Sequence, residues 1–317
     1  MATQHGQDLV TPEEKMASRV LAIRKLQPPY DLEQLASAYG EVEYLELPFS
    51  VDGITIGIGA AAKPRILINS SAPATRRKFT LAHEIGHVVI PWHTGTIVSH
   101  LENREVDAAY SQMETEANRF AAELLMPSDW LREAFNAASS VEQYFRSVLT
   151  LAGASKEATL NKILRPLLQP VICVQVESAS RVLSRRKSQT APYPPELNAE
   201  VSSETFPTDC RFESFEIDGQ LYMSWTFVGR DIQEVDKRPW REVYTQILND
   251  TGMQAYLQNM NGILAAAYGK NKALDEAEIC GAVIRAFAKY EMFNVVTEHE
   301  LFEQFVIKRV RELKQRG

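Results

Sequence analysis

The spacing of apolar and polar positions divides the first part of the chain into two helices and a group of strands. A helix is predicted over residues 11–27, with Thr11 as N-cap, Pro12 in the first turn and Pro28 as its end. A short helix, capped by Asp31, is predicted up to Gly40. Both carry apolar residues at helical spacing and are expected to pack on a core.

Three strand-like segments follow, at residues 42–47, 54–58 and 65–69. Turn residues separate them at 51–53 and 62–64. Because these connections are short, an antiparallel meander is predicted rather than βαβ units.

Two longer helices are predicted next. Ser70 and Ser71 offer an N-cap for the first, which Pro91 ends. Residues 92–105 are polar and are interpreted as a loop, and residues 107–126 have an apolar stripe at helical spacing.

The second half of the chain mixes strands with helices. A strand is predicted at 170–176, a long exposed loop at 181–207, and a hairpin at 211–228 whose turn is Asp218-Gly219. The loop contains Arg185-Arg186-Lys187, which is interpreted as a solvated stretch rather than a nucleic-acid patch. Helices are then predicted over residues 239–249, 253–268 and 274–293, and from a capping box at Thr297 to the basic end of the chain.

Composition places the chain among ordinary globular proteins, with 317 residues, 45% hydrophobic and 24% charged. This length predicts two domains. The net charge of −7 argues against direct nucleic-acid binding. The 3 cysteines form no C-x-x-C pair, which argues against a disulfide framework and a cysteine zinc site.

The sequence predicts neither a signal peptide nor a membrane-spanning segment. The N-terminus lacks the basic and apolar regions of a signal peptide. No stretch approaches the roughly 20 apolar residues of a membrane span. A soluble, cytoplasmic protein is expected.

The candidate chemistry lies in the first long helix, in the sequence His83-Glu84-Ile85-Gly86-His87. Residues four apart share one face of a helix, so both imidazoles can reach one point. Glu84 lies about 100° round from His83, within reach of a water at that point. Two neutral nitrogen ligands, an open position and a carboxylate are what a zinc hydrolase requires.

A pair of histidines at this spacing can also be an ordinary part of a core or a solvated face. Three features favour a metal here. A Glu occupies the required position, the chain has only 6 His, and the flanking residues are mostly apolar. Burying two His beside a Glu is costly unless a metal or a partner compensates.

Catalytic zinc needs a third protein ligand, and two carboxylates on the second long helix compete for that role. Glu114 shares a face with Asn118, which could hold a ligand from behind. Glu116 lies on roughly the opposite side and is interpreted as a solvated carboxylate, so Glu114 is preferred. His93 and His100 are interpreted as ordinary loop histidines.

These stretches resemble the ImmA/IrrE family of bacterial metallopeptidases. The matching segments are 77–87 and 114–127, and the likeness extends over about residues 10–167. The resemblance therefore implies a peptidase domain at 1–167 and a second domain at 168–317. The resemblance implies an α+β, zincin-like peptidase domain with a small antiparallel sheet and a gluzincin-like site. It assigns His83, His87 and Glu114 as zinc ligands, and Glu84 as general base.

The resemblance also implies a substrate, because characterised members cut helix-turn-helix repressors of stress-response or mobile-element genes. An extended substrate could pair with an edge strand, for which residues 54–58 are the candidate; the alternative, that these residues form a plain core strand, is left open. A Tyr or His that stabilises the oxyanion is expected, but the sequence does not identify it; Tyr110 and His93 are only nearby in sequence. By analogy alone, the mostly helical second domain would serve regulation, sensing or substrate recruitment.

Two other interpretations remain open at this point. The protein could be a non-catalytic sensor or interaction protein with structural zinc. It could also be the effector half of a toxin–antitoxin-like pair. Structural zinc sites favour Cys and have no use for a base beside the first ligand, which weighs against the first.

Overall fold

The computed structural model describes residues 10–48, 51–60, 62–99, 108–177, 180–206 and 210–316. The chain folds into two compact units, Met1–Pro166 and Leu167–Gly317, and each is described by itself. The first unit contains the H-E-x-x-H segment. Its elements are α1 (Pro12–Arg24), α2 (Leu32–Ser37), β1 (Glu41–Leu45), β2 (Gly53–Ile58), β3 (Arg65–Asn69), α3 (Ala74–Val89), β4 (Gly95–Ser99), α4 (Ala108–Leu125), α5 (Ser128–Ala137), α6 (Val141–Ala152) and α7 (Lys156–Lys162).

The two N-terminal helices begin as predicted. At α1 the backbone N–H of Thr11 donates to the Glu14 carboxylate at 2.9 Å, and Pro12 occupies the first turn. At α2 the Asp31 side chain accepts the N–H of Gln34 at 3.0 Å. The first helix is shorter than predicted, because Lys25 takes a left-handed conformation that ends it.

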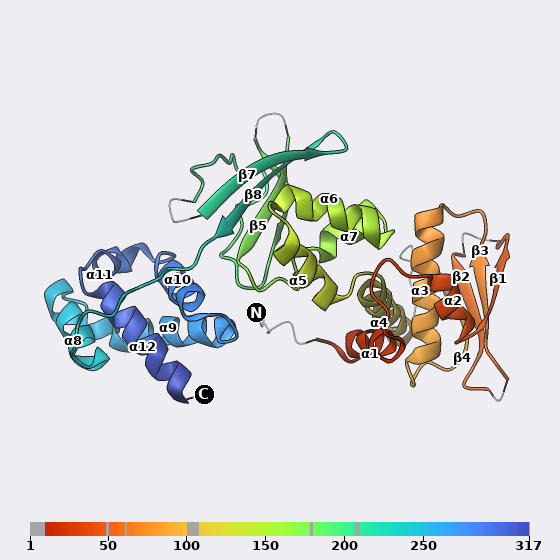
Figure 1. Ribbon diagram of the computed structural model, residues 1–317, viewed down its shortest axis with the longest axis horizontal. Coiled ribbons are helices and arrows are strands. Elements are labelled where there is room, and N and C mark those ends of the chain that lie inside the picture. Colours follow the sequence, from red (N-terminus) through yellow and green to blue (C-terminus); the bar gives the residue numbers. More distant parts are fainter. Residues whose placement is uncertain are drawn as a thin grey trace. The chain divides into compact units, whose positions relative to one another are not determined.

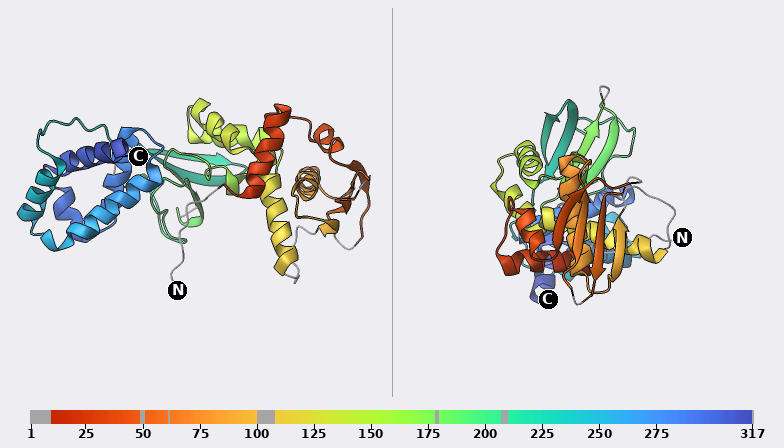
Figure 2. Two further views of the ribbon diagram at one scale, coloured as in Figure 1. Left: turned by 90° about the horizontal axis from the view of Figure 1, so that it is seen from below. Right: turned by 90° about the vertical axis from the view of Figure 1, so that its right-hand side faces the viewer.

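The sheet of the first unit has the strand order β1-β3-β2-β4, so the predicted antiparallel meander is wrong. β1 runs parallel to β3, whereas β2 is antiparallel to both β3 and β4. β3 is buried at four of its five positions and lies inside the sheet, between β1 and β2. Turn residues in the sequence specify the connection between β2 and β3. They do not specify which strand pairs with β3 on its other side. The right-hand view in Figure 2 faces these strands.

A further strand, β4, lies inside the segment that was predicted to be a loop. It pairs with β2 through registers such as Ile54 with Val98, and only Ile97 and Ser99 of its five residues are buried. Among the described residues β4 is an edge of the sheet, and β2, the predicted edge, is internal. The mostly exposed β4 has too few apolar positions for its pattern to distinguish it from a loop.

The two long helices α3 and α4 pack side by side, and α3 also contacts β2 and β3 (Figure 1). A Cβ at Gly86 would lie 3.0 Å from the ring of Phe120, so the glycine allows this close approach. The N-cap of α3 is Pro73 and not Ser70 or Ser71. The Ser71 hydroxyl instead donates to Asn69 at 2.7 Å. Residue 107, the predicted start of α4, lies outside the described residues.

The second unit begins with an antiparallel sheet of order β6-β5-β8-β7. The strands are β5 (Val171–Val176), β6 (Val182–Lys187), β7 (Cys210–Ile217) and β8 (Gln220–Phe227). β6 occupies part of the predicted 181–207 loop, so that prediction is wrong there. The hairpin is confirmed: Asp218 and Gly219 have φ of 49° and 72°, the positive values of a type I′ turn.

Helices complete the second unit and enclose a separate apolar core. They are α8 (Trp240–Thr251), η1 (Gln254–Tyr256), α9 (Leu257–Asn271), α10 (Glu276–Phe287), η2 (Glu291–Phe293), α11 (Asn294–Thr297) and α12 (Phe302–Arg316). Thr297 ends α11 rather than capping the last helix, which starts at Phe302. Of the helices seen in the described part of the chain, none has both the length and the apolar character of a membrane span.

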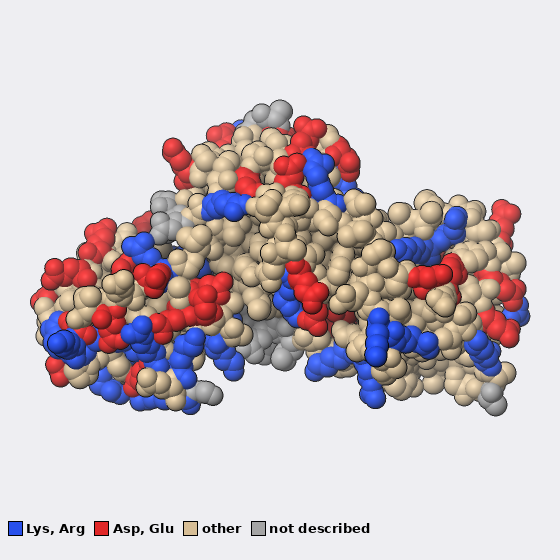
Figure 3. Space-filling view, in the orientation of Figure 1, with Lys and Arg blue, Asp and Glu red and all other residues tan. Residues whose placement is uncertain are grey.

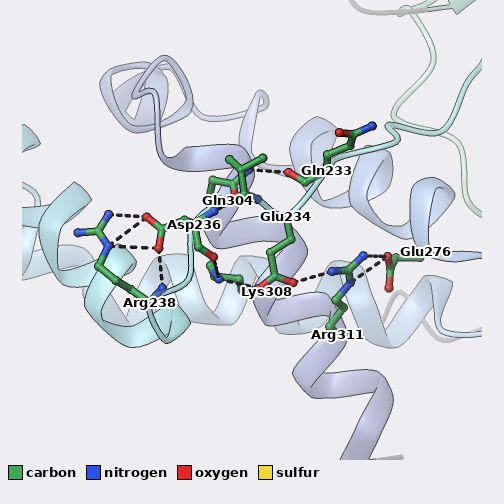
Figure 4. Close-up of polar contacts among 9 residues, drawn as sticks. Gln233, Glu234, Asp236, Arg238, Glu276, Gln304, Lys308 and Arg311 are labelled. Atoms are coloured by element: carbon green, nitrogen blue, oxygen red, sulfur yellow. Dashed lines mark hydrogen bonds and ion pairs between the residues drawn. The ribbon is translucent and has the colours of Figure 1, made fainter.

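The connection between β8 and α8 is held against α12 by polar side chains (Figure 4). Lys308 donates to Glu234 at 2.6 Å, and Arg311 contacts Glu234 and Glu276 at 2.6 and 2.8 Å. The basic end of the last helix is therefore engaged in ion pairs within the unit. Figure 3 accordingly shows acidic and basic side chains interspersed over these helices.

Gln304 is the central contact of this connection, and its replacement by alanine is expected to destabilise the second unit. Its carbonyl accepts the N–H groups of Val235 and Asp236 at 2.9 and 3.0 Å, and its amide donates to the Gln233 carbonyl at 2.9 Å. Losing these bonds should lower the free energy of unfolding by about 1–3 kcal/mol, measured by denaturant titration.

Glu303 on the same helix is the matched control. It forms an ion pair with Arg230 in which both side chains are more than two-fifths exposed. Glu303→Ala is expected to cost only about 0–1 kcal/mol. Equal losses in the two variants would contradict the importance assigned to Gln304.

Candidate metal centre

The buried face of α3 carries the three residues of the H-E-x-x-H segment. His83, Glu84 and His87 each have 0% of their surface exposed. Because the two histidines are one helical turn apart, both rings point to one side, and their Nε2 atoms are 3.0 Å apart.

Glu114 reaches this point from α4. Its Oε2 lies 3.4 Å from Nε2 of His83, and its Oε1 lies 3.4 Å from Nε2 of His87. Neither oxygen has a hydrogen-bond partner among the described residues, although both are buried. Tetrahedral ligands at zinc distances of about 2.0–2.1 Å would be about 3.3 Å apart. The three donors therefore have the chemistry and the spacing to hold a metal ion.

The hydrogen bond made by the other ring nitrogen of His83 identifies its tautomer. Its Nδ1 is 3.0 Å from Oδ1 of Asn118 on α4, and an amide oxygen can only accept. Nδ1 therefore carries the proton, and Nε2 presents its lone pair towards Glu114. The structure thus brings together His83, His87 and Glu114, with Asn118 behind His83.

The electrostatics favour the protonation states that metal ligands need at two of these groups. Burial opposes ionisation of Glu114, but the two His contacts outweigh it and lower its pKa to about 2. Burial lowers the pKa of His87 to about 4. At His83, burial alone would lower the pKa, but the contact with Glu114 and the charge of Glu84 raise it overall. A proton therefore competes with a metal chiefly at His83.

The Glu84 side chain contacts β2 through Thr55. Its Oε2 accepts the hydroxyl of Thr55 at 2.5 Å, whereas its Oε1 has no hydrogen-bond partner among the described residues. Burial raises the pKa of Glu84, and the contacts with His83 and Thr55 only partly oppose this. A carboxylate with a raised pKa is a better proton acceptor near neutral pH.

Comparison with known proteins identifies this part of the chain. The family model described as the IrrE N-terminal-like domain, from a peptidase family, matches residues 42–164. This part of the chain belongs to the ImmA/IrrE family. None of the curated proteins matches the chain significantly. Among solved structures it is similar to a Mycobacterium tuberculosis transcriptional regulator, with 12% identity and a TM-score of 0.38, over 68% of this chain and 75% of that chain.

The ImmA/IrrE domain contains two further polar residues whose interpretation from sequence was wrong. Glu116 is only 8% exposed and is not a solvated carboxylate. It accepts Nε1–H of Trp92 and the amide of Gln112, and lies 3.0 Å from Nε2 of His93. His93 is 1% exposed and is not an ordinary loop histidine. His100 lies outside the described residues.

A spacing signal could have drawn attention to His93. It follows His87 by six residues, which is the spacing of the third zinc ligand in the H-E-x-x-H-x-x-G-x-x-H pattern. Ile90 stands where that pattern has Gly. In the ImmA/IrrE domain His93 contacts Nδ1 of His87, on the side opposite the ligand nitrogen, and it is not part of the donor cluster.

Tyr110 lies near the ImmA/IrrE site, one turn before Glu114 on α4. Its hydroxyl donates to the carbonyl oxygen of Val98 on β4. Burial raises the pKa of Tyr110, and the charges of Glu114 and Glu84 add to the effect. The hydroxyl therefore stays protonated near neutral pH, and in this structure its one proton is donated to Val98 on the edge strand.

Proposed function

We propose that this protein is a zinc-dependent endopeptidase. The observation that carries the proposal is the convergence of His83, His87 and Glu114 at separations of 3.0 to 3.4 Å, with Glu84 beside them. Two imidazoles and one carboxylate form the ligand set of a catalytic zinc site and leave a coordination position open. Membership of a peptidase family supports a peptide bond as the target.

Zinc, when bound, supplies a Lewis acid that polarises the scissile carbonyl and makes a water acidic near neutral pH. The protein supplies the proton transfers. Glu84 accepts the proton of the attacking water at its unpartnered Oε1, while Thr55 holds Oε2. Glu84 then donates this proton to the leaving amine. Tyr110 is the candidate donor to the oxygen that gains negative charge.

The edge strand β4 is the proposed docking site for the substrate backbone. An extended peptide can add to an exposed edge by main-chain hydrogen bonds. β4 suits this role because it ends the sheet within the described residues and pairs with β2, the strand that carries Thr55. This replaces the earlier assignment of residues 54–58, which lie on the internal strand.

The proposed substrate is a helix-turn-helix repressor, whose cleavage would relieve repression of stress-response or mobile-element genes. Support comes from the resemblance to characterised family members. We propose that the second unit, residues 168–317 in the predicted division, regulates the peptidase or recruits its substrate.

The test uses the purified protein, loaded with zinc, and as substrate a helix-turn-helix protein encoded by a neighbouring gene. A single metal-dependent cut, located by mass spectrometry and stopped by a chelator, is expected. An unrelated helix-turn-helix protein serves as control. Absence of zinc in the purified protein, together with no cleavage after loading, would contradict the enzyme assignment.

Gly53 at the start of β2 leaves space for Glu84, and its replacement by alanine is expected to impair catalysis. A Cβ there would lie 2.4 Å from Oε1 of Glu84 and 2.8 Å from the methyl group of Thr80. Displacing the general base should lower kcat by about tenfold or more, up to the 10²–10⁴-fold that such a base contributes in total. Zinc content should not change, because neither histidine is displaced.

Gly262→Ala, in α9 of the second unit, is the control, since a Cβ there meets no atom within 4 Å. Both variants are compared by steady-state kinetics and metal analysis. A Gly53→Ala protein with wild-type kcat would show that the position of Glu84 tolerates the methyl group.

A further inference from the structure

A chain of buried polar groups lies behind His87, on the side opposite Glu114. Nδ1 of His87 is 2.8 Å from Nδ1 of His93. Nε2 of His93 is 3.0 Å from Oε2 of Glu116. The two imidazoles have 0% and 1% of their surface exposed, and Glu116 has 8%.

The chemistry of these groups sets the direction of both hydrogen bonds. An ionised carboxylate only accepts, so Nε2 of His93 donates to Glu116. The Nδ1 of a neutral His93 is then without a proton and accepts from Nδ1–H of His87. The remaining nitrogen of His87, Nε2, is left with a lone pair, and this is the atom 3.4 Å from Glu114.

Glu116 is itself held in place from two other directions. Nε1–H of Trp92 donates to Oε2, the oxygen that also faces His93. The amide of Gln112, one turn earlier on α4, donates to Oε1 at 2.8 Å. A carboxylate with this many partners is a fixed acceptor and can hold one orientation of His93.

We propose that Glu116 and His93 are positioning residues that act in series to fix the tautomer and ring orientation of His87 for metal binding. The inference rests on the proposed metal site, but it concerns residues outside the donor cluster. Hydrogen-bond partners of ligand histidines typically change metal affinity by about 10–100-fold when they are removed. Glu114 and Glu116, two residues apart on α4, would then both serve the metal, one directly and one through two imidazoles.

The contact also differs from the one behind the other ligand. His83 donates to the neutral amide of Asn118, whereas His87 donates to an imidazole that is in turn bonded to a carboxylate. The negative charge of Glu116, transmitted through His93, increases the basicity of Nε2 of His87. Metal binding by His87 should therefore depend more on its hydrogen-bond partners than metal binding by His83 does.

The experiment measures zinc affinity of the full-length protein by competition with a chromophoric chelator. His93→Phe, which fills the space but removes both hydrogen bonds, is expected to weaken binding by about 10–100-fold. Glu116→Gln keeps the size of the side chain and its neighbours but removes the charge, and it should also weaken zinc binding. Thr115→Ala is the matched control, because it removes a hydrogen bond on the same helix, from the exposed Thr115 hydroxyl to the Ser111 carbonyl, that touches none of these groups. The zinc affinity of this control should stay within about threefold of wild type, a smaller change than that expected on removing a hydrogen-bond partner of a ligand histidine.

Two further measurements separate positioning from a general loss of structure. The thermal midpoints of the metal-free variants should match wild type. The visible absorption of the cobalt-loaded protein should change in His93→Phe and Glu116→Gln but not in Thr115→Ala. If His93→Phe fails to fold, Glu116→Gln decides alone. Wild-type affinity and spectrum in the decisive variant would overturn the inference.

The result also separates this inference from the proposed function. If wild-type protein binds no zinc, the metal site itself is wrong. If wild type binds zinc and Glu114→Gln loses it, while His93→Phe and Glu116→Gln keep it, only the positioning role fails.

Discussion

Replacing Glu84 by glutamine is expected to lower peptidase activity by about 10²–10⁴-fold, the contribution of a general base, without loss of zinc. Glutamine has nearly the same shape and can keep the contact with Thr55, but it cannot accept a proton. Glu84 is not one of the three clustered donors, so the metal should stay in place. The measurement is kcat for cleavage of the repressor, together with zinc content by metal analysis.

The control for this variant is Thr55→Val, which keeps the Glu84 carboxylate but removes the hydroxyl that holds it. Its activity should fall less than that of Glu84→Gln, because the base is still present. A Glu84→Gln protein that cleaves at the wild-type rate would exclude Glu84 as the base. Loss of zinc from this variant would instead mean that Glu84 takes part in holding the metal.

Replacing Glu114 by glutamine is expected to weaken zinc binding by more than about 100-fold, beyond the range for outer partners of a ligand. The Glu114 carboxylate supplies the only anion among the three clustered donors, and both its oxygens face the histidine nitrogens. Wild type at a free zinc concentration of about 100 times Kd should gain about 2.7 kcal/mol of stability. The Glu114 variant should gain much less at the same concentration.

Glu116→Gln provides the comparison, because it lies two residues away on the same helix and affects the metal only through His93. Its loss of affinity should be the smaller of the two. Both are measured by chelator competition and by the zinc-dependent shift of Tm. Loss of zinc only in the Glu116 variant would reverse the assignment of the third ligand.

Part of the candidate site could be predicted because it depends on local geometry. His83 and His87 are four residues apart on one helix, and the helix period alone brings their rings together. The same periodicity on the second helix correctly grouped Glu114 with Asn118. It could not reveal that Glu116 is buried, because the loop residues Trp92 and His93 fold back over that side of α4.

The sheet illustrates the same limit. The β2–β3 hairpin follows from short-range turn signals, and it is present. The parallel pairing of β1 with β3 joins segments more than 20 residues apart and has no local signature. β4 was missed because an exposed edge strand buries few side chains and therefore shows no clear alternation.

The sequence by itself determined the helix that carries His83, Glu84 and His87, the second helix with Glu114, and the membership of residues 42–164 in a peptidase family. These depend on periodicity and on motif spacing, which are properties of neighbouring residues. Only the tertiary structure decided that Glu114 lies beside the histidines, that β4 is the edge of the sheet, and that His93 joins Glu116 to His87. Each of these requires segments distant in sequence to be brought within hydrogen-bond range, and it is the burial of α3 between α4 and the sheet that does so.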